Sequence, residues 1–236
     1  MKELLYVVIP AYNEEANIKD VVSQWDEAIG KITDDYVIMV ANDGSRDNTL
    51  KVLQELQVDM SHLQIVDKPN SGHGATLLTL YKKAIEQGAK YIFQTDSDGQ
   101  TLPEEFDAFW KERESYDFII GTRYGRQDGI SRIIVTKTLR AVVRLCFGVK
   151  VPDANTPYRL METKKLKAII DRMPDDYNLT NVVISAVGCK WGYDIKWIPI
   201  TFRPRQGGVN SINLRRITKI GVHAIKDFIN INRIYK

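Results

Sequence analysis

The stretch Leu4-Leu5-Tyr6-Val7-Val8-Ile9-Pro10 is a short apolar run, and it sets the first element of the fold. Polar residues follow it at positions 12–15, and an amphipathic stretch comes next over residues 18–29. A short apolar run favours a buried strand, whereas apolar residues at helical spacing favour a helix. This segment therefore predicts a strand, a loop and a helix in that order.

The same order recurs further along the chain. Strands are predicted over residues 36–40, 63–66 and 91–95, with helices over 49–56 and from beyond Gly72 to near Gly88. The pattern then becomes mixed, with predicted strands over 118–121 and 197–202 and a helix over 133–147. Alternating helices and apolar strands indicate a parallel sheet covered on both sides. We expect an α/β fold with a Rossmann-like, mostly parallel sheet flanked by helices on both faces.

The 236 residues and 44% hydrophobic content allow a substantial core in one domain. The formal net charge of +3 is unevenly distributed, because residues 201–236 carry eight Lys or Arg and one acid. This asymmetry indicates an anionic partner or surface, unless the cations only solubilise a helix or bind the phosphates of a ligand. From residue 214 onward, apolar positions at helical spacing predict a basic amphipathic helix that lies in a membrane interface or on the domain. The predicted division is a catalytic domain over 1–212 and a helical tail over 213–236.

The cellular location is inferred from several absences. Cys146 and Cys189 lie far apart without Cys-x-x-Cys or Cys/His clustering, so buried thiols are expected and neither a disulfide framework nor a zinc site is indicated. The N-terminus lacks the apolar region and cleavage site of a signal peptide. No stretch approaches the roughly 18 uninterrupted apolar residues of a membrane span. We expect a cytoplasmic protein that at most touches the inner face of a membrane.

The absence of several well-known motifs narrows the range of possible enzyme classes. No Gly-x-Gly-x-x-Gly follows the first strand, and Ser71-Gly72-His73-Gly74-Ala75-Thr76 lacks the lysine of a P-loop. A Gly-x-Ser-x-Gly elbow is also absent. Dinucleotide dehydrogenases, P-loop NTPases and α/β-hydrolases are therefore disfavoured. His73 stands between two glycines, where it either touches a phosphate or only fills a loop.

Three polar loops follow predicted strands, at residues 10–14, 42–45 and 96–100. Ligands bind beyond the carboxyl ends of the strands in such sheets, so these loops are expected to converge on one site. In Asp96-Ser97-Asp98-Gly99-Gln100, two carboxylates two residues apart can point at one hard cation such as Mg²⁺ or Mn²⁺. Asp and Gly are also common in turns, but the convergence of three loops favours a metal site.

These segments carry a resemblance to a known family. The chain resembles the family 2 glycosyltransferases of GT-A fold, and within them the polyprenyl- or dolichyl-phosphate sugar synthases. The resemblance spans nearly the whole chain, on residues 7–14, 40–49, 96–100, 121–124, 153–160 and 198–203. It implies an inverting, metal-dependent transferase that uses a UDP- or GDP-sugar as donor and a polyprenyl phosphate as acceptor. No nucleic-acid partner is expected.

The resemblance also implies residue roles. The nucleotide is expected to contact Pro10, Tyr12, Glu14, Asn42 and Asp43. The metal and diphosphate are expected at Asp96, Ser97, Asp98 and Gln100. Arg123 and Arg132 match arginines near the acceptor phosphate, a group that a guanidinium fork suits. Arg159 matches a segment near the sugar pocket, and Arg205 matches a basic loop that closes over the donor.

Two departures from the family pattern concern the charges of the site. Asn42 stands where an acid is expected, and the loop Arg205-Gln206-Gly207-Gly208-Val209-Asn210-Ser211 lacks the lysine that lipid-phosphate synthases often carry. The acceptor therefore stays open between a polyprenyl phosphate and a hydroxyl group in polysaccharide or glycolipid synthesis. A phosphate is already anionic, whereas a hydroxyl needs a base, for which Asp153 is the candidate. A nucleotidyltransferase and a non-catalytic sugar-nucleotide binding module are the remaining alternatives.

Overall fold

A computed structural model describes residues 3–123, 129–203 and 225–235, with only the backbone described for residues 129–135. The first half of the chain alternates strands and helices, as the sequence predicts. Its elements are β1 (Leu5–Ala11), α1 (Ile18–Gly30), β2 (Tyr36–Asp43), α2 (Thr49–Asp59), β3 (Leu63–Lys68), α3 (His73–Glu86) and β4 (Tyr91–Gln94). Strand β1 is buried along its whole length, as expected for a central strand of such a sheet.

The second half contains elements that the sequence pattern did not predict. A 3₁₀ turn over Pro103–Glu105 leads to α4 (Phe106–Trp110), β5 (Phe118–Arg123), α5 (Gly129–Phe147), β6 (Arg159–Glu162), α6 (Thr163–Ile170), α7 (Thr180–Lys190) and β7 (Ile195–Ile200). Helix α7 is buried from Thr180 to Gly188, so it has no polar stripe from which a helical period could be recognised. Strand β7 begins two residues before the predicted strand and ends two residues earlier.

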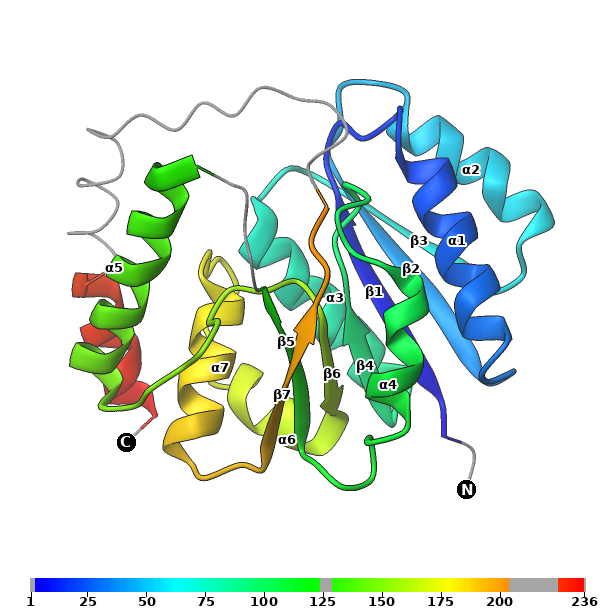
Figure 1. The fold of residues 1–236 in the computed structure, drawn as a ribbon. Helices are drawn as coiled ribbons and strands as arrows, with labels where there is room; N and C mark the ends of the chain where they lie inside the picture. Colours follow the sequence, from blue (N-terminus) through cyan, green and yellow to red (C-terminus); the bar gives the residue numbers. More distant parts are fainter. Residues whose placement is uncertain (1–2, 124–128, 204–224, 236) are drawn as a thin grey trace.

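The seven strands form one sheet in the order β3-β2-β1-β4-β6-β5-β7. Among the strands that the structure describes, only β6 is antiparallel to its neighbours, β4 and β5. The other pairs are parallel, including β1 with β2 and β5 with β7. The prediction of a mostly parallel sheet is confirmed. The carboxyl ends of β1, β2 and β4 therefore meet at one edge of the sheet, where the polar loops begin (Figure 1).

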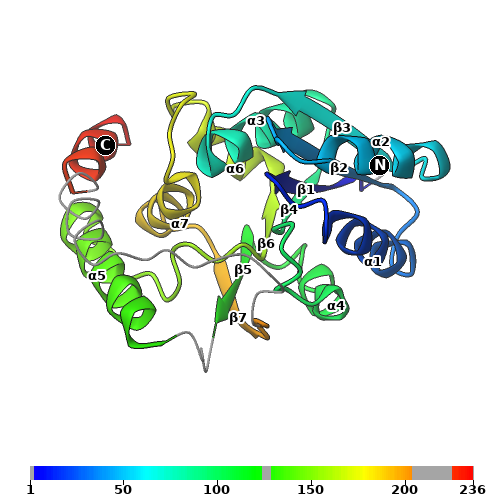
Figure 2. The same ribbon diagram turned by 90° about the horizontal axis from the view of Figure 1, so that it is seen from above.

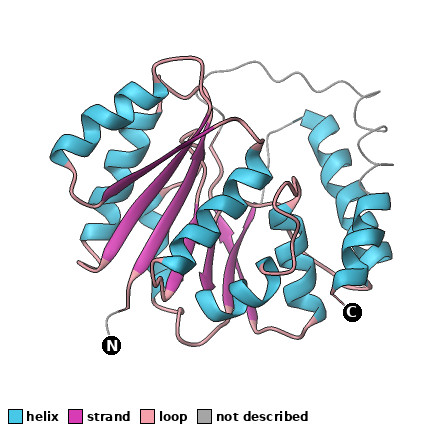
Figure 3. Cartoon of the chain, turned by 180° about the vertical axis from the view of Figure 1, so that it is seen from behind, coloured by secondary structure: helices cyan, strands magenta, loops and turns pink. Residues whose placement is uncertain are grey.

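Two apolar layers cover the sheet, one on each face. Alternate β1 residues enter different layers: Val7 belongs to the layer that contains α1, α2 and α4, whereas Val8 belongs to the layer that contains α3, α5, α6 and α7. Figure 2 shows α1 and α4 on one side of the strands and α3, α6 and α7 on the other. In the view from behind, the strands lie between the two helical layers (Figure 3). The predicted helices on both faces are confirmed.

The end of the chain packs on this domain. Residues 225–234 are helical, and the buried side chains of Phe228, Ile231 and Tyr235 join the apolar layer that contains α5, α6 and α7. The hydroxyl of Tyr235 donates a hydrogen bond of 2.8 Å to the carbonyl of Ile169. The buried face of this helix therefore packs on the domain, which is one of the two placements that the sequence left open. The rest of the basic tail, residues 204–224, lies outside the described residues.

Two further observations concern the cysteines and the helices. Cys146 and Cys189 are free thiols, and both are half-buried where full burial was expected. Across the described ranges, none of the helices has the length and apolar character needed to span a bilayer.

Candidate functional site

A pocket of about 400 Å³ opens at the edge of the sheet where β1, β2 and β4 end. It is lined by the ends of β1 and β2, by the loops after β1, β3 and β4, and by the start of α3, through Pro10, Ala11, Tyr12, Glu14, Asp43, Asn70, Gly72, His73, Thr76, Asp96, Ser97 and Asp98. Seven of the residues that the sequence proposed for the donor or the metal lie in this lining. The expected convergence of the loops after β1, β2 and β4 is therefore present in the structure.

The loops after β1 and β2 are tied together, and the loop after β1 forms one wall of the pocket together with Asp43 at the end of β2. The backbone N–H of Asn13 donates to the hydroxyl of Ser45 at 3.0 Å, and the backbone N–H of Glu14 donates to the hydroxyl of Thr49 at 2.8 Å. Asn13 has a φ of 55°, in the left-handed region that asparagine tolerates better than most residues. This turn places the neighbouring side chains of Tyr12 and Glu14 in the pocket lining.

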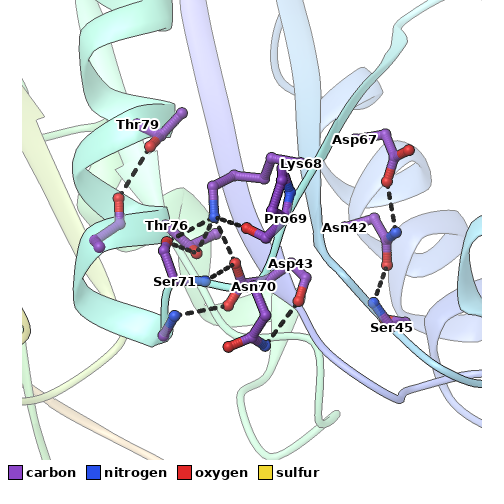
Figure 4. Close-up of polar contacts among 12 residues, drawn as sticks. Asn42, Asp43, Ser45, Asp67, Lys68, Pro69, Asn70, Ser71, Thr76 and Thr79 are labelled. Atoms are coloured by element: carbon purple, nitrogen blue, oxygen red, sulfur yellow. Dashed lines mark hydrogen bonds and ion pairs between the residues drawn. The ribbon is translucent and has the colours of Figure 1, made fainter. Parts of the chain in front are cut away.

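Asp43 lies at the centre of a polar cluster beside the pocket (Figure 4). Its Oδ1 accepts hydrogen bonds from Lys68 Nζ at 2.5 Å and from the Ser71 N–H at 2.9 Å. Its Oδ2 accepts from the Gly72 N–H at 3.0 Å. Burial alone would raise the pKa of Asp43, but the hydrogen bonds from Lys68 and Ser71 lower it below the usual range. The carboxylate is therefore held ionised and in a fixed orientation.

The neighbouring Asn42 faces away from the pocket, because successive strand residues point to opposite sides. Its Nδ2 donates to Asp67 Oδ1 at 2.7 Å, and its Oδ1 accepts from the Ser45 N–H at 3.3 Å (Figure 4). In this structure Asn42 shapes the turn after β2 and does not line the pocket.

Asp96 and Asp98 follow β4 and line the pocket where this strand ends. Asp96 Oδ1 lies 3.8 Å from His73 Nε2 and accepts a hydrogen bond of 3.3 Å from Gln94 Nε2. Burial raises the pKa of Asp96, and the electrostatic interactions with His73 and Arg123 only partly oppose this effect. A cation placed beside such a buried carboxylate stabilises its ionised form.

The two carboxylates fit a divalent cation that arrives with a ligand. Within the described parts of the chain, no group of three or more His, Cys, Asp or Glu side chains is arranged to hold a metal. Mg²⁺ commonly binds through one or two carboxylates together with substrate phosphates and water. The hard oxygen atoms of Asp96 and Asp98 match that pattern.

Gln100, expected near the metal, engages the chain beyond β7. Its side-chain Nε2 donates to the backbone carbonyl of Arg203 at 2.7 Å, and the backbone carbonyl of Gln100 accepts from the Arg203 N–H at 2.8 Å. These bonds join the loop after β4 to the segment that leads into residues 204–224. Gln100 is buried and does not line the pocket.

Arg123 and Asp153 form an ion pair next to this site. Nε and Nη2 of Arg123 each donate a 2.8 Å hydrogen bond to a different carboxylate oxygen of Asp153. The Arg123 guanidinium also lies 5.2 Å from the centre of the Phe202 ring. Both partners were expected on the acceptor side, but their pairing was not predicted.

Arg159 is fully buried and lies outside the pocket lining. Its guanidinium donates to the carbonyls of Thr156, Asn181 and Ala154 and to the hydroxyl of Ser185. Burial lowers the pKa of Arg159 to about 10, so it remains charged at neutral pH. In this structure its hydrogen bonds to Thr156 and Ala154 support the loop before β6.

Four expected contributors cannot be placed. Arg132 falls within α5, but its side chain lies outside the described residues, and so do Arg205, Asn210 and Ser211.

The sequence interpretation missed the loop after β3. It supplies Asn70 and Gly72 to the pocket, and Lys68 holds Asp43. Its position directly after a strand was the signal that could have identified it.

The similarities to known proteins agree with this geometry. The family model described as Glycosyl transferase family 2 matches residues 6–198. The chain is 28% identical over 72% of its length to a UDP-N-acetylglucosamine–dolichyl-phosphate N-acetylglucosaminyltransferase of Methanococcus voltae, of which the match covers 74%. It is 25% identical over 88% of its length to a polyprenol monophosphomannose synthase of Mycolicibacterium smegmatis, covering 80% of that protein.

A solved structure shares the fold. Glucosyl-3-phosphoglycerate synthase from Mycobacterium tuberculosis, in complex with Mn²⁺, UDP-glucose and phosphoglyceric acid, superposes with a TM-score of 0.68 at 18% identity. The superposition covers 97% of this chain and 79% of that one.

Proposed function

The chain belongs to glycosyl transferase family 2, and we propose that it transfers a sugar, with inversion, from a nucleoside diphosphate sugar to a polyprenyl phosphate. The observation that carries this proposal is the pocket in which the loops after β1 and β2 face Asp96 and Asp98. One wall presents Tyr12 and the fixed carboxylate of Asp43 to the nucleoside. The other wall presents two carboxylates to a metal and the diphosphate.

We propose that Asp96 and Asp98 hold Mg²⁺ or Mn²⁺ together with the donor diphosphate. When bound, such an ion neutralises the charge that develops on the departing nucleoside diphosphate. His73, at the start of α3, lies on the same side of the pocket and is placed to meet an anionic oxygen. The solved relative with Mn²⁺ and UDP-glucose supports a metal in this role without specifying which metal this chain uses.

The ion pair of Arg123 with Asp153 favours a phosphate acceptor over a hydroxyl acceptor. A hydroxyl acceptor needs a carboxylate that can take its proton. Asp153 instead directs both oxygens at Arg123. A guanidinium has five N–H groups, so three remain on Arg123 for an acceptor phosphate. That phosphate is already a nucleophile and needs no base. The names of both relatives contain a dolichyl phosphate or a polyprenol phosphate sugar, which agrees with this choice.

A lipid acceptor requires contact with a membrane surface. We propose that the contact is made by a basic outer surface of α5 and residues 225–234, defined by exposed Arg144, Leu145, Lys226, Ile229, Arg233 and Ile234. Helix α5 and the final helix lie side by side, since Asn232 Nδ2 donates to the Cys146 carbonyl at 2.8 Å (Figure 1). Basic residues interspersed with apolar ones suit an anionic lipid surface.

The deciding experiment measures release of nucleoside diphosphate from a panel of UDP- and GDP-sugars. Each donor is tested with Mg²⁺ or Mn²⁺, in the presence and absence of a short-chain polyprenyl phosphate. Release that depends on the lipid phosphate is the expected result. Metal-dependent donor binding without lipid-stimulated release would contradict the acceptor assignment and indicate a hydroxyl acceptor.

A further inference from the structure

Behind Asp96 lies a cluster of buried polar side chains that packing alone does not explain. It comprises Tyr81 of α3, Gln94 of β4, Arg159 of β6 and Asn181 of α7. Three of these side chains have no exposed surface, and Asn181 is 3% exposed. Burying polar groups costs stability unless each is hydrogen-bonded, and apolar side chains could fill the same space. A polar cluster at this depth therefore points to a role other than packing.

The cluster forms a chain of hydrogen bonds that ends on Asp96. Gln94 Nε2 donates to Asp96 Oδ1 at 3.3 Å, and Gln94 Oε1 accepts from the Tyr81 hydroxyl at 3.2 Å. The Tyr81 hydroxyl also lies 3.2 Å from the side-chain oxygen of Asn181. The Tyr81 hydroxyl has a single proton, so it cannot donate to Gln94 and to Asn181 at the same time. The orientation of the Asn181 amide is assigned from its surroundings and can be reversed. Turning the Asn181 amide lets its NH₂ group donate to Tyr81, so that every donor in the chain points toward Asp96.

Arg159 supports the far end of this chain. It is the cross-strand partner of Gln94 in the register of β4 with β6, so the two side chains lie on the same face of the sheet. Its Nη1 donates to the Asn181 carbonyl at 3.2 Å, which holds the first turn of α7 against the sheet. Burial raises the pKa of Tyr81, so this residue stays protonated and can donate.

We propose that Tyr81 and Gln94, supported by Asn181 and Arg159, are positioning residues that fix the orientation of Asp96 for binding the metal together with the donor diphosphate. The chain occupies one oxygen of the carboxylate and so limits its rotation. This inference rests on the proposed function, because it concerns the same metal-binding carboxylate. It adds four residues that line neither wall of the pocket and whose effect on the ligand passes through Asp96.

The test compares Tyr81→Phe with Tyr235→Phe. Both tyrosines are fully buried, and the Tyr235 hydroxyl donates to the Ile169 carbonyl away from the pocket, so the two variants lose a similar group. Calorimetric titration with Mn²⁺–UDP and Mn²⁺–GDP, and with each nucleotide without metal, measures binding without turnover. We expect Tyr81→Phe to weaken metal–nucleotide binding about tenfold, as for other residues that orient metal ligands. Tyr235→Phe should leave metal–nucleotide binding unchanged. The affinity for the nucleotide without metal should be the same in the two variants.

A second variant tests the connection directly. Gln94→Met removes both hydrogen bonds of Gln94 while keeping a similar volume. Combined with Tyr81→Phe, it should weaken metal–nucleotide binding less than the sum of the single effects, because both changes interrupt one chain. Equal metal–nucleotide affinities of the two tyrosine variants, or additive effects in the double variant, would overturn the inference. The proposed function would still stand in that case, provided that the wild-type protein binds the metal–nucleotide. Failure of the wild-type protein to bind either metal–nucleotide would reject both.

Discussion

Arg123 and Asp153 are joined by two hydrogen bonds of 2.8 Å, and their side chains are only 10% and 7% exposed. Arg123 ends β5, whereas Asp153 lies in the loop before β6. The pair therefore fixes that loop against the end of the sheet and sets the direction of the guanidinium. An arginine held in this way meets a phosphate with little loss of side-chain freedom.

Replacing Asp153 by Asn should affect both stability and acceptor use. Breaking one side of a buried ion pair costs about 3–5 kcal/mol, because the remaining charge has no partner. We expect a loss of unfolding free energy of this order in urea titrations. The KM for the polyprenyl phosphate should rise as Arg123 loses its fixed direction, while the affinity for the donor stays near the wild-type value.

Asp107→Asn is the matched control for this variant. Asp107 pairs with Lys111 on the surface, where the two side chains are 47% and 72% exposed. Such exposed pairs contribute about 0–1 kcal/mol. Similar losses of unfolding free energy in the two variants would mean that the pair of Arg123 with Asp153 does not behave as a buried ion pair. An unchanged acceptor KM in Asp153→Asn would remove its role in positioning the acceptor.

Asp98→Asn should abolish turnover and leave the fold intact. The substitution keeps the shape of the side chain but removes the negative charge that a divalent cation requires. Nucleoside diphosphate release at saturating Mn²⁺ measures the loss, and thermal unfolding checks that the protein is folded. Full activity in this variant would reject the assignment of Asp98 to the metal.

Asp43 should make the stability of the protein depend on pH. Its folded pKa lies below its ordinary value, because hydrogen bonds from Lys68 and Ser71 outweigh the opposing effect of burial. The resulting stabilisation is present above the unfolded pKa of about 3.9 and is lost as pH falls toward the folded pKa. The difference in unfolding free energy between wild type and Asp43→Asn should therefore be largest near neutral pH and shrink below about pH 4.

Urea titrations at several pH values measure this difference. Glu27→Gln is a useful comparison, because Glu27 pairs with Lys31 on the surface and both side chains are about 70% exposed. That variant should differ little from wild type at any pH. A difference for Asp43→Asn that stays constant from pH 7 to pH 3 would contradict the ionised state assigned to the carboxylate.

Most of the N-terminal half of the fold could be predicted because β1, β2 and β3 are each followed by an amphipathic helix. The same local signals placed Asp43, Asp96 and Asp98 at strand ends, and the shared edge of a parallel sheet then brought them together. Helix α7 could not be predicted in this way, since burial on all sides leaves no helical period. Spacing in sequence also gives no direction for a side chain that follows a strand.

The different environments of Asn42 and Arg159 illustrate that limit. Both match family segments near the donor, yet Asn42 contacts Asp67 and Arg159 contacts the carbonyls around α7. Their orientation depends on strand pleat and on packing across the sheet, which involve residues distant in sequence. The partners of the buried Arg159 come from the loop before β6 and from α7, so they are determined only by the complete fold.

Leu145 offers a test of the proposed membrane contact. It is 78% exposed on α5, next to exposed Arg144, within the basic outer surface defined above. Burying a leucine side chain in an apolar environment contributes about 1.5–3 kcal/mol, so Leu145→Asp should weaken vesicle binding by about tenfold or more. Sedimentation with vesicles that contain or lack anionic lipid measures the effect.

Val58→Asp is the control, because Val58 is 84% exposed on α2, in the helical layer on the other face of the sheet. If both variants bind anionic vesicles as the wild type does, the membrane contact is not made by this surface.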